Sequence, residues 1–303
     1  MQLSKREVEL LDFLLRGSAT TTALAAALAI KKPNLSIYLK KLQSHSLVEI
    51  KREGRSGIIS LAPLISSNFS SVKLGFQFLK LADILVGWTP SLLSYMRYKK
   101  KFVLSDLDLP NITSKRILKK LRSIGLVYMA KRGQYELRGE AMPIAEFCST
   151  CLTMVYGSIA SREIKGLSAW VTSHDSISHT EVIFLTKEKV VSKNYWPTAF
   201  SAFDWYGIHL ISAGKFYYTN IKPDISDIII HTLALSGDAR NISYVSALMI
   251  KNSFNPKKLL KKKQLFGLDK GFINNLIEFI ETKGKKTFIG FPSWEEVGGV
   301  LNG

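Results

Sequence analysis

Cysteine is scarce in this chain, and its one close pair has a spacing that metal and redox sites use. Cys148 and Cys151 form Cys-Ser-Thr-Cys. A structural zinc site needs four ligands, and the sequence holds no second cysteine pair. A redox pair normally follows a strand, whereas this pair lies in an apolar stretch that is predicted to be helical. We therefore interpret both as buried thiols without a metal. Two cysteines exclude a disulfide scaffold and fit a reducing cytoplasm.

A second candidate for chemistry is Gly157-Ser158, which follows an apolar run. It is similar to the Gly-Ser that opens a nucleotidyltransferase site. That chemistry also needs paired carboxylates that hold Mg²⁺, and the next stretch offers only Glu163 and Asp175, without Asp-x-Asp spacing. A nucleotidyltransferase-like enzyme with a DNA-targeting half is therefore the less favoured alternative, and we expect no enzyme activity and no cofactor.

The histidines do not complete a catalytic set. His174 and His179 have no Ser or Cys nucleophile context, so a surface loop is expected there. His231 lies in an apolar helical pattern, which favours a packed core residue over a ligand.

Basic residues are the strongest chemical signal, and they are unevenly distributed. The 303 residues include 42 Lys and Arg against 24 Asp and Glu, a formal net charge of +18. Residues 1–139 hold 24 basic and 9 acidic residues, whereas residues 140–303 hold 18 and 15. A charge of this size implies a polyanionic partner or an anionic surface. The asymmetry predicts that the first half contacts nucleic acid.

The composition is that of a folded chain with more than one domain. It is 46% hydrophobic and 22% charged, which allows a buried core and argues against wholesale disorder. The length suits two or three domains. No apolar run approaches the roughly 18 residues of a membrane span, and the first residues continue into an amphipathic pattern rather than a signal peptide. We expect a cytoplasmic protein with no membrane partner.

A ten-residue phrase recurs within the basic half. Residues 39–48 and 118–127 match at seven of ten positions, at an offset of 79. That offset is longer than a solenoid repeat and suits two copies of a small domain. Each copy continues, over 49–61 and 128–137, with a strand, a basic glycine turn and a second strand, which is typical of a β-hairpin.

Helical spacing precedes the first hairpin. We expect a helix over 8–15 and a second helix that Thr21-Thr22 caps. A break at Pro33 follows, and then a third helix over 35–44 that Asn34 caps. The third helix buries a leucine stripe and turns its basic and serine residues outward.

The second copy has a similar but less regular start. Its spacing predicts a first helix over 72–85, an extra helix over 90–97 and a short helix over 103–107. A third helix then starts from a cap at Thr113 or Ser114.

This order of helices, turn, helix and hairpin is that of a helix-turn-helix with a wing. The phrase Leu39-Lys-Lys-Leu, with Leu47-Val48 and Lys51-Arg52-Glu53-Gly54-Arg55 after it, resembles the recognition helix and wing of prokaryotic transcription regulators of the winged helix-turn-helix superfamily. The resemblance covers residues 4–62 and 72–139. It implies sequence-specific binding of double-stranded DNA.

The candidate DNA-binding residues follow from the outward helix faces and the wings. A recognition helix fits the major groove, where Arg or Lys near its N-terminus favours guanine and Asn favours adenine. Other basic residues would neutralise phosphates, and wing residues would hold phosphate or enter a minor groove. The set is Lys32, Asn34, Ser36, Lys40, Lys41, Lys51, Arg52, Arg55, Ser114, Lys115, Arg116, Lys119, Lys120, Arg122, Lys131 and Arg132. The alternative is a pair of solvated faces on winged helices that bind proteins, and the sequence does not decide whether both copies contact DNA.

The second half has a different pattern. Strands are expected over 169–173, 180–185, 208–213 and 215–219. Helices are expected over 143–156, 224–235, 244–251, from Asn255-Pro256, and over 271–283. We therefore predict an α+β protein with winged helix-turn-helix domains at 1–65 and 70–140. An α+β domain with a helical tail, for assembly or partner binding, is predicted at 141–303.

Two further patterns each have more than one interpretation. Aromatic residues are dense between 196 and 218, where core packing is favoured and a protein-binding surface is the alternative. Their low local charge disfavours single-stranded nucleic acid. The lysines between 257 and 263 form a basic helix face that is either solvated or binds phosphate or an acidic partner.

The layout of the whole chain resembles the AbiEi class of antitoxins. The resemblance in the second half is carried by His231-Thr-Leu-Ala-Leu, Leu259-Leu260, Phe266-Gly267-Leu268 and Ile277-Glu278. It implies a DNA-binding autoregulator paired with a nucleotidyltransferase toxin, in a type IV toxin–antitoxin system. A second winged helix departs from the simplest form of that family. A replication initiator or plasmid-maintenance protein is the alternative, and the sequence indicates no oligomeric state.

Overall fold

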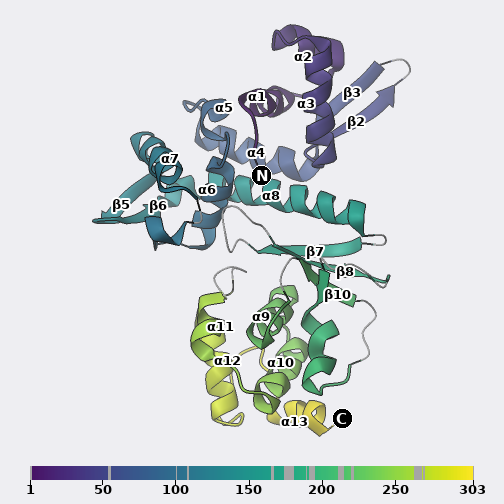
Figure 1. The fold of residues 1–303 in the computed structure, drawn as a ribbon, viewed down its shortest axis with the longest axis vertical. Helices are drawn as coiled ribbons and strands as arrows, with labels where there is room; N and C mark the ends of the chain where they lie inside the picture. Colours follow the sequence, from purple (N-terminus) through teal and green to yellow (C-terminus); the bar gives the residue numbers. More distant parts are fainter. Residues whose placement is uncertain are drawn as a thin grey trace. The chain divides into compact units, whose positions relative to one another are not determined.

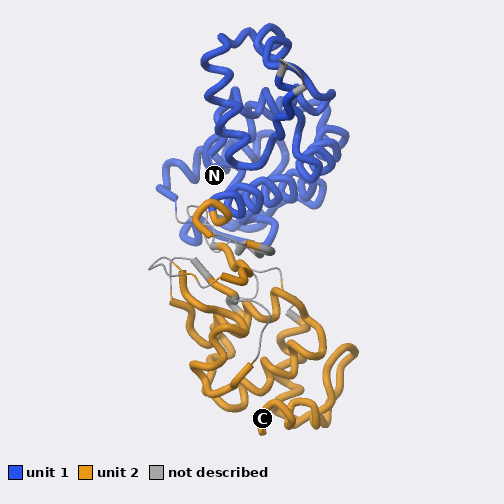
Figure 2. Tube along the Cα trace, turned by 90° about the vertical axis from the view of Figure 1, so that its right-hand side faces the viewer, with its two compact units in different colours: residues 1–159, 176–180 blue, residues 160–175, 181–303 orange. Residues whose placement is uncertain are grey.

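The computed structural model describes residues 2–53, 56–99, 101–107, 109–164, 167–173, 181–188, 190, 195–210, 215–219, 222–262, 268 and 270–302. Contacts divide the chain into two compact units, which Figure 2 colours separately. Unit 1 is residues 1–159 with 176–180, and unit 2 is residues 160–175 with 181–303. Helices are combined with small antiparallel sheets, so the predicted α+β class is confirmed.

Unit 1 begins with three helices and a three-stranded antiparallel sheet, which we call module A. Its elements are α1 (Lys5–Leu14), β1 (Ala19–Thr20), α2 (Thr21–Ala27), α3 (Lys32–Ser44), β2 (Val48–Glu53) and β3 (Ser56–Leu61). The strand order is β1-β3-β2, and the β2–β3 hairpin extends beyond α3 (Figure 1). Helix α1 starts with a capping box: Ser4 Oγ accepts from the Glu7 amide, and the Glu7 carboxylate accepts from the Ser4 amide at 2.7 Å.

Threonine and proline set the starts of α2 and α3. Thr20 Oγ1 caps α2 by accepting a hydrogen bond from the Ala23 amide at 3.2 Å. The prediction that Thr21-Thr22 caps this helix is wrong, because both residues already lie inside it. Helix α3 begins at Lys32 and carries Pro33 in its first turn, where the missing amide costs no helical hydrogen bond. The prediction that Asn34 caps this helix is wrong, because Asn34 already lies inside it.

The same element order recurs later in unit 1, in what we call module B. Its elements are α6 (Thr89–Tyr98), β4 (Lys101–Val103), the 3₁₀ helix η1 (Leu104–Asp106), α7 (Asn111–Ser123), β5 (Val127–Lys131) and β6 (Gln134–Leu137). The strand order β4-β6-β5 matches that of module A. Helices α3 and α7 are 13 residues each, and their bounds differ by the repeat offset. The predicted caps Thr113 and Ser114 are wrong, because the N-cap of α7 is Pro110.

Two helices connect the modules, α4 (Pro63–Gly75) and α5 (Leu81–Ile84). The single helix predicted over 72–85 does not form. The chain leaves α4 at Gly75 and forms a separate short helix whose Leu81 and Ile84 are buried. The helix predicted as an extra one over 90–97 is α6, which takes in module B the place that α1 has in module A.

One continuous hydrophobic core joins both modules to helix α8 (Met142–Glu163), which follows the 3₁₀ helix η2 (Gly139–Ala141). Phe69 of α4 stacks on Phe147 of α8, with ring centroids 4.6 Å apart. Leu42 and Leu121, matched by the repeat, are both fully buried in this core. The modules therefore stabilise each other through shared burial.

Unit 2 contains a four-stranded antiparallel sheet of order β7-β8-β10-β9. Its strands are β7 (Leu167–Ser173), β8 (Glu181–Thr186), β9 (Tyr195–Pro197) and β10 (Lys215–Thr219), with the 3₁₀ helix η3 (Ala199–Tyr206) after β9. The strand predicted over 208–213 is not found at 208–210, and its remaining residues lie outside the described ones. Three strands occur where the sequence predicted them, whereas β9 and η3 were not predicted.

Helices complete unit 2 and pack around their own core. They are α9 (Ile225–Leu235), α10 (Ala239–Lys251), α11 (Pro256–Lys262), α12 (Lys270–Glu281) and α13 (Trp294–Asn302). Asp224 and Asp238 cap α9 and α10 by accepting backbone amide hydrogen bonds at 2.8 Å. The Asn241 amide and the Ser236 hydroxyl both donate hydrogen bonds to the Asp238 carboxylate, and they hold its pKa below the usual value.

Candidate nucleic-acid interface

Helix α3 separates its residues into a buried and an exposed face. Leu35, Leu39 and Leu42 are buried, because they recur at helical spacing and face the core of unit 1. Four residues that the sequence assigned to DNA contact are exposed on this helix. These are Lys32, Asn34, Ser36 and Lys40.

Helix α7 presents the corresponding face in module B. Ile117, Leu118 and Leu121 are buried, and the opposite face is more basic than that of α3. The predicted contacts on it that are exposed are Lys115, Arg116, Lys119 and Arg122. Two exposed basic helix faces, each 13 residues long, thus lie in the half of the chain that carries most of the positive charge.

The second lysine of each Leu-Lys-Lys-Leu phrase has an internal role. Lys41 Nζ lies 2.9 Å from Glu7 Oε1 and donates to the Gln2 carbonyl at 3.1 Å. Lys120 Nζ donates to the carbonyl oxygen of Asp83 in α5. Because both ammonium groups already contact a preceding segment of the chain, we assign Lys41 and Lys120 to positioning their helices rather than to binding DNA.

The prediction that Ser114 contacts DNA is wrong, because its side chain is not on the surface. It is fully buried on the inner face of α7, and no hydrogen-bond partner of its hydroxyl is found within the described part of the chain. In the repeat register Ser114 corresponds to Leu35, which is also fully buried. The register alone therefore places Ser114 on the core side, and this signal was available in the sequence.

The hairpins expose the predicted wing residues that the structure describes. Lys51 and Arg52 on β2, and Lys131 and Arg132 at the β5–β6 turn, are all exposed. Lys51 Nζ lies 3.9 Å from Glu49, an exposed pair of little energetic weight. Arg55 lies outside the described residues. Both hairpins thus carry cations where a wing would meet phosphate.

A carboxylate stands at the base of the second hairpin. Glu136 accepts a hydrogen bond from the Tyr128 hydroxyl and lies 3.1 Å from Lys101 Nζ. These two donors hold the pKa of Glu136 below its usual value, and the same hydrogen bond raises the pKa of Tyr128. The contacts link β4, β5 and β6 and so fix the base from which Lys131 and Arg132 project.

The two cysteines are buried in α8, as predicted. Burial raises the pKa of both thiols, so neither is a thiolate near neutral pH. Among the described residues, no group of three or more histidine, cysteine, aspartate or glutamate side chains is placed to hold a metal ion.

The other sequence candidates for chemistry lie in helices or outside the described residues. Gly157-Ser158 is inside α8 rather than at a strand end, and Glu163 accepts a hydrogen bond from the Tyr195 hydroxyl. His231 is fully buried and shares a hydrogen bond of 2.6 Å with Thr198, which agrees with a packed core histidine. His174, Asp175 and His179 lie outside the described residues.

The aromatic cluster of unit 2 is partly core and partly surface. Phe203 and Tyr217 are buried, whereas Trp205 remains 45% exposed. Lys222 Nζ lies 5.4 Å from the ring centre of Trp205 and 5.7 Å from that of Trp196, which is a cation–π distance. Core packing accounts for the buried rings only.

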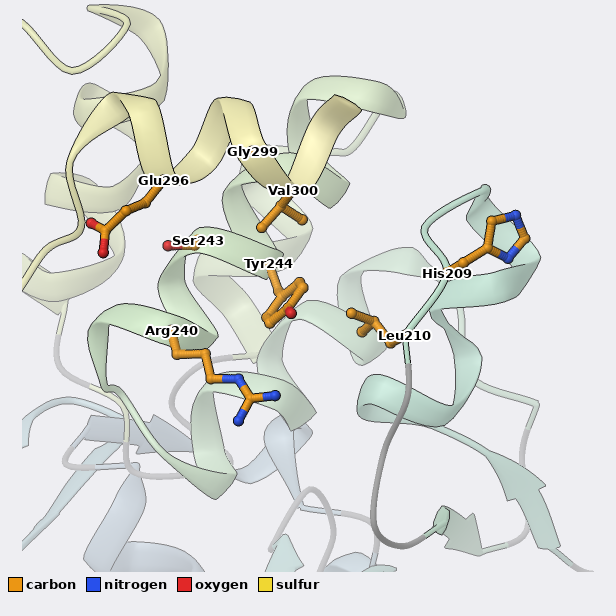
Figure 3. A pocket seen from close by; sticks show the side chains of 8 residues that line it. All are labelled: His209, Leu210, Arg240, Ser243, Tyr244, Glu296, Gly299 and Val300. Carbon is orange, nitrogen blue, oxygen red and sulfur yellow. The ribbon is translucent and has the colours of Figure 1, made fainter. Parts of the chain in front are cut away.

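Unit 2 also has a pocket of about 450 Å³ beside α10 and α13. Figure 3 shows the side chains of Arg240 and Tyr244 next to each other among its lining residues, with Glu296 and His209 on either side of them. Arg240 lies over the Tyr244 ring at 5.8 Å. His209 pairs with Asp204 at 3.1 Å, and the Glu296 carboxylate accepts a hydrogen bond from the Ser293 amide at 2.7 Å, so these polar groups are occupied in local contacts. They do not form a nucleophile–base pair.

Comparisons with known proteins give no match: no family model matches the chain, and no curated protein or solved structure matches it significantly. No described helix is long and apolar enough to cross a membrane.

Proposed function

We propose that this chain is a sequence-specific, double-stranded DNA-binding transcriptional regulator, with modules A and B acting as tandem winged helix-turn-helix domains. The observation that carries the proposal is the repeated exposed basic face of α3 and α7, each helix followed by a hairpin with exposed cations. A B-DNA major groove, roughly 12 Å wide, admits one α-helix. The net positive charge of residues 1–139 supplies the phosphate attraction.

The roles of the residues follow from their places on the helices. Lys40, Lys119 and Arg122 would neutralise phosphates, because they lie on the exposed faces in the later part of each helix. Asn34 and Arg116 lie in the first half of α3 and α7, where side chains reach bases, and would favour adenine and guanine respectively. Wing residues Lys131 and Arg132 and their counterparts in module A would hold the flanking backbone.

We further propose that the protein is an autoregulator of the antitoxin kind, in which unit 2 binds a protein partner. The net positive charge lies mostly in the first half, whereas basic and acidic residues are nearly equal in number in the second half. This difference supports DNA binding by the first half and protein binding by unit 2. Co-expression with the product of the adjacent gene tests it: the chain should relieve toxicity of that product, and unrelieved toxicity would count against the antitoxin role alone.

Selection of genomic DNA by the purified full-length chain tests the DNA-binding function. Fragmented DNA from its own source is bound at about 150 mM salt, which suppresses non-specific contacts. We expect enrichment of one or two repeats upstream of its own gene. Enrichment of origin repeats would favour a replication initiator, and salt-sensitive binding without a preferred sequence would contradict sequence-specific regulation.

A further inference from the structure

Each candidate recognition helix exposes one isoleucine. Ile37 in α3 is 64% exposed and Ile112 in α7 is 84% exposed. The neighbours of Ile37 along the outer face of α3, Ser36 and Lys40, are polar and exposed. Ile112 is likewise followed, one turn later on α7, by the exposed Lys115 and Arg116. Each isoleucine is therefore a single apolar side chain beside polar residues, which is smaller than the apolar patches that bind proteins.

The two isoleucines lie on matching stripes of their helices. Residues spaced by four and then three share one helix face, so Ile37 precedes Lys40 on the outer stripe of α3. On α7 the same spacing aligns Ile112, Arg116 and Lys119. The repeat offset pairs Lys40 with Lys119 and Ile37 with Arg116, so the modules share a cation and differ at the position one turn before it.

An apolar side chain has one specific partner in the major groove. Thymine presents its C5 methyl group there, and apolar side chains recognise it by contact, whereas guanine presents two acceptors that suit arginine. Resting on the proposed function, we propose that Ile37 and Ile112 read thymine methyl groups. At the same position of the two helices, Ile37 of module A would then contact thymine, whereas Arg116 of module B would bind guanine. The two segments of the operator consequently differ in sequence, and a palindrome is not expected.

Removal of a single methyl group from the DNA tests this proposal directly. Random duplexes are selected with the full-length chain, and the enriched duplex is resynthesised with deoxyuridine at one thymine at a time. At one or more thymines the wild-type affinity should fall about fourfold, the value for one buried methyl group. Ile37→Ala and Ile112→Ala should each abolish the thymine–uracil difference at one position and leave the other positions unchanged.

Matched variants separate recognition from folding and from general loss of apolar surface. Ile289→Ala removes an isoleucine in unit 2 that is more exposed than either of them and should leave every thymine–uracil difference intact. Arg116→Ala should abolish discrimination between guanine and 7-deazaguanine, which lacks the N7 acceptor, without changing the response to uracil at the Ile37 position. The circular dichroism spectrum of each variant should match that of the wild type, because the substituted side chains are exposed.

Three outcomes would overturn the proposal, and they differ in what they say of the function. Indifference of the wild type to uracil at every thymine would reject thymine reading while sequence-specific binding stands. A uracil effect that persists unchanged in both isoleucine variants would assign the reading to other residues. Failure to enrich any duplex would reject the proposed function itself, and the inference with it.

Discussion

Modules A and B have the same element order, but they hold their outward helix with contacts of different strength. In module A, Lys41 pairs with Glu7, whose side chain is only 2% exposed. In module B the matching Lys120 reaches a backbone carbonyl at Asp83, whose side chain is 44% exposed and pairs with Lys5. The same sequence phrase therefore gives the same backbone elements in both modules. The contribution of the matched lysine to the free energy of unfolding, by contrast, depends on how deeply its partner is buried.

The largest effect should come from the matched core leucines. Leu42→Ala and Leu121→Ala each remove a fully buried side chain, which should lower the free energy of unfolding by about 2–5 kcal/mol. Urea unfolding followed by circular dichroism measures it. Because one core joins the modules, either variant should shift one common transition. Two separate transitions, one per module, would show that the modules unfold independently.

The matched lysines should differ in their effect on stability. Lys41→Ala leaves the buried Glu7 carboxylate without its cation, which should cost about 1–3 kcal/mol. Lys120→Ala removes an exposed contact and should change stability by less than about 0.5 kcal/mol. Thermal unfolding of the two variants measures the loss of stability in each. Equal losses would contradict the proposed difference between the two lysine contacts.

Lys40→Gln and Lys119→Gln test whether both modules contact DNA. Each should weaken binding about fivefold for every sequence and lower the salt slope by about one, as the loss of one phosphate contact does. Fluorescence anisotropy across a salt series measures both quantities. An effect of Lys119→Gln alone would mean that module B binds DNA while module A packs against another surface.

Ser114→Ala should have the smallest effect. Its hydroxyl is buried, so the substitution should leave DNA affinity unchanged and alter the free energy of unfolding by no more than about 1 kcal/mol, in the stabilising direction. Competition binding and urea titration check the two expectations. A clear loss of affinity would restore Ser114 to the interface.

Local patterns in the sequence predicted the elements that depend on them. The repeat indicated α3, α7 and the two hairpins, because leucine spacing and glycine turns are local signals. The apolar run around Cys148 and Cys151 indicated a helix with buried thiols, and the pattern around His231 indicated a packed side chain. In each case the burial follows from residues within one or two turns.

Features that depend on distant residues were not predictable. The apolar spacing over 72–85 did not predict that α4 ends at Gly75 or that a separate helix α5 buries Leu81 and Ile84. The internal partners of Lys41 and Lys120 come from segments more than 30 residues away. Helix α13 was missed because its two glycines lower helix propensity, whereas burial of Val297 and packing of Val300 and Leu301 against the core of unit 2 favour the helix.

The central claim is that the exposed faces of α3 and α7 together bind duplex DNA, and a charge-matched pair of variants tests it most directly. The affinity of the full-length chain for its selected duplex is measured for the double variant Lys40→Glu/Lys119→Glu. The control is the double variant Lys187→Glu/Lys285→Glu, which makes the same charge change at exposed sites in unit 2. We predict a loss of about a hundredfold for the first variant and less than about threefold for the second. Equal losses would contradict the claim, because they would show that net charge alone attracts DNA.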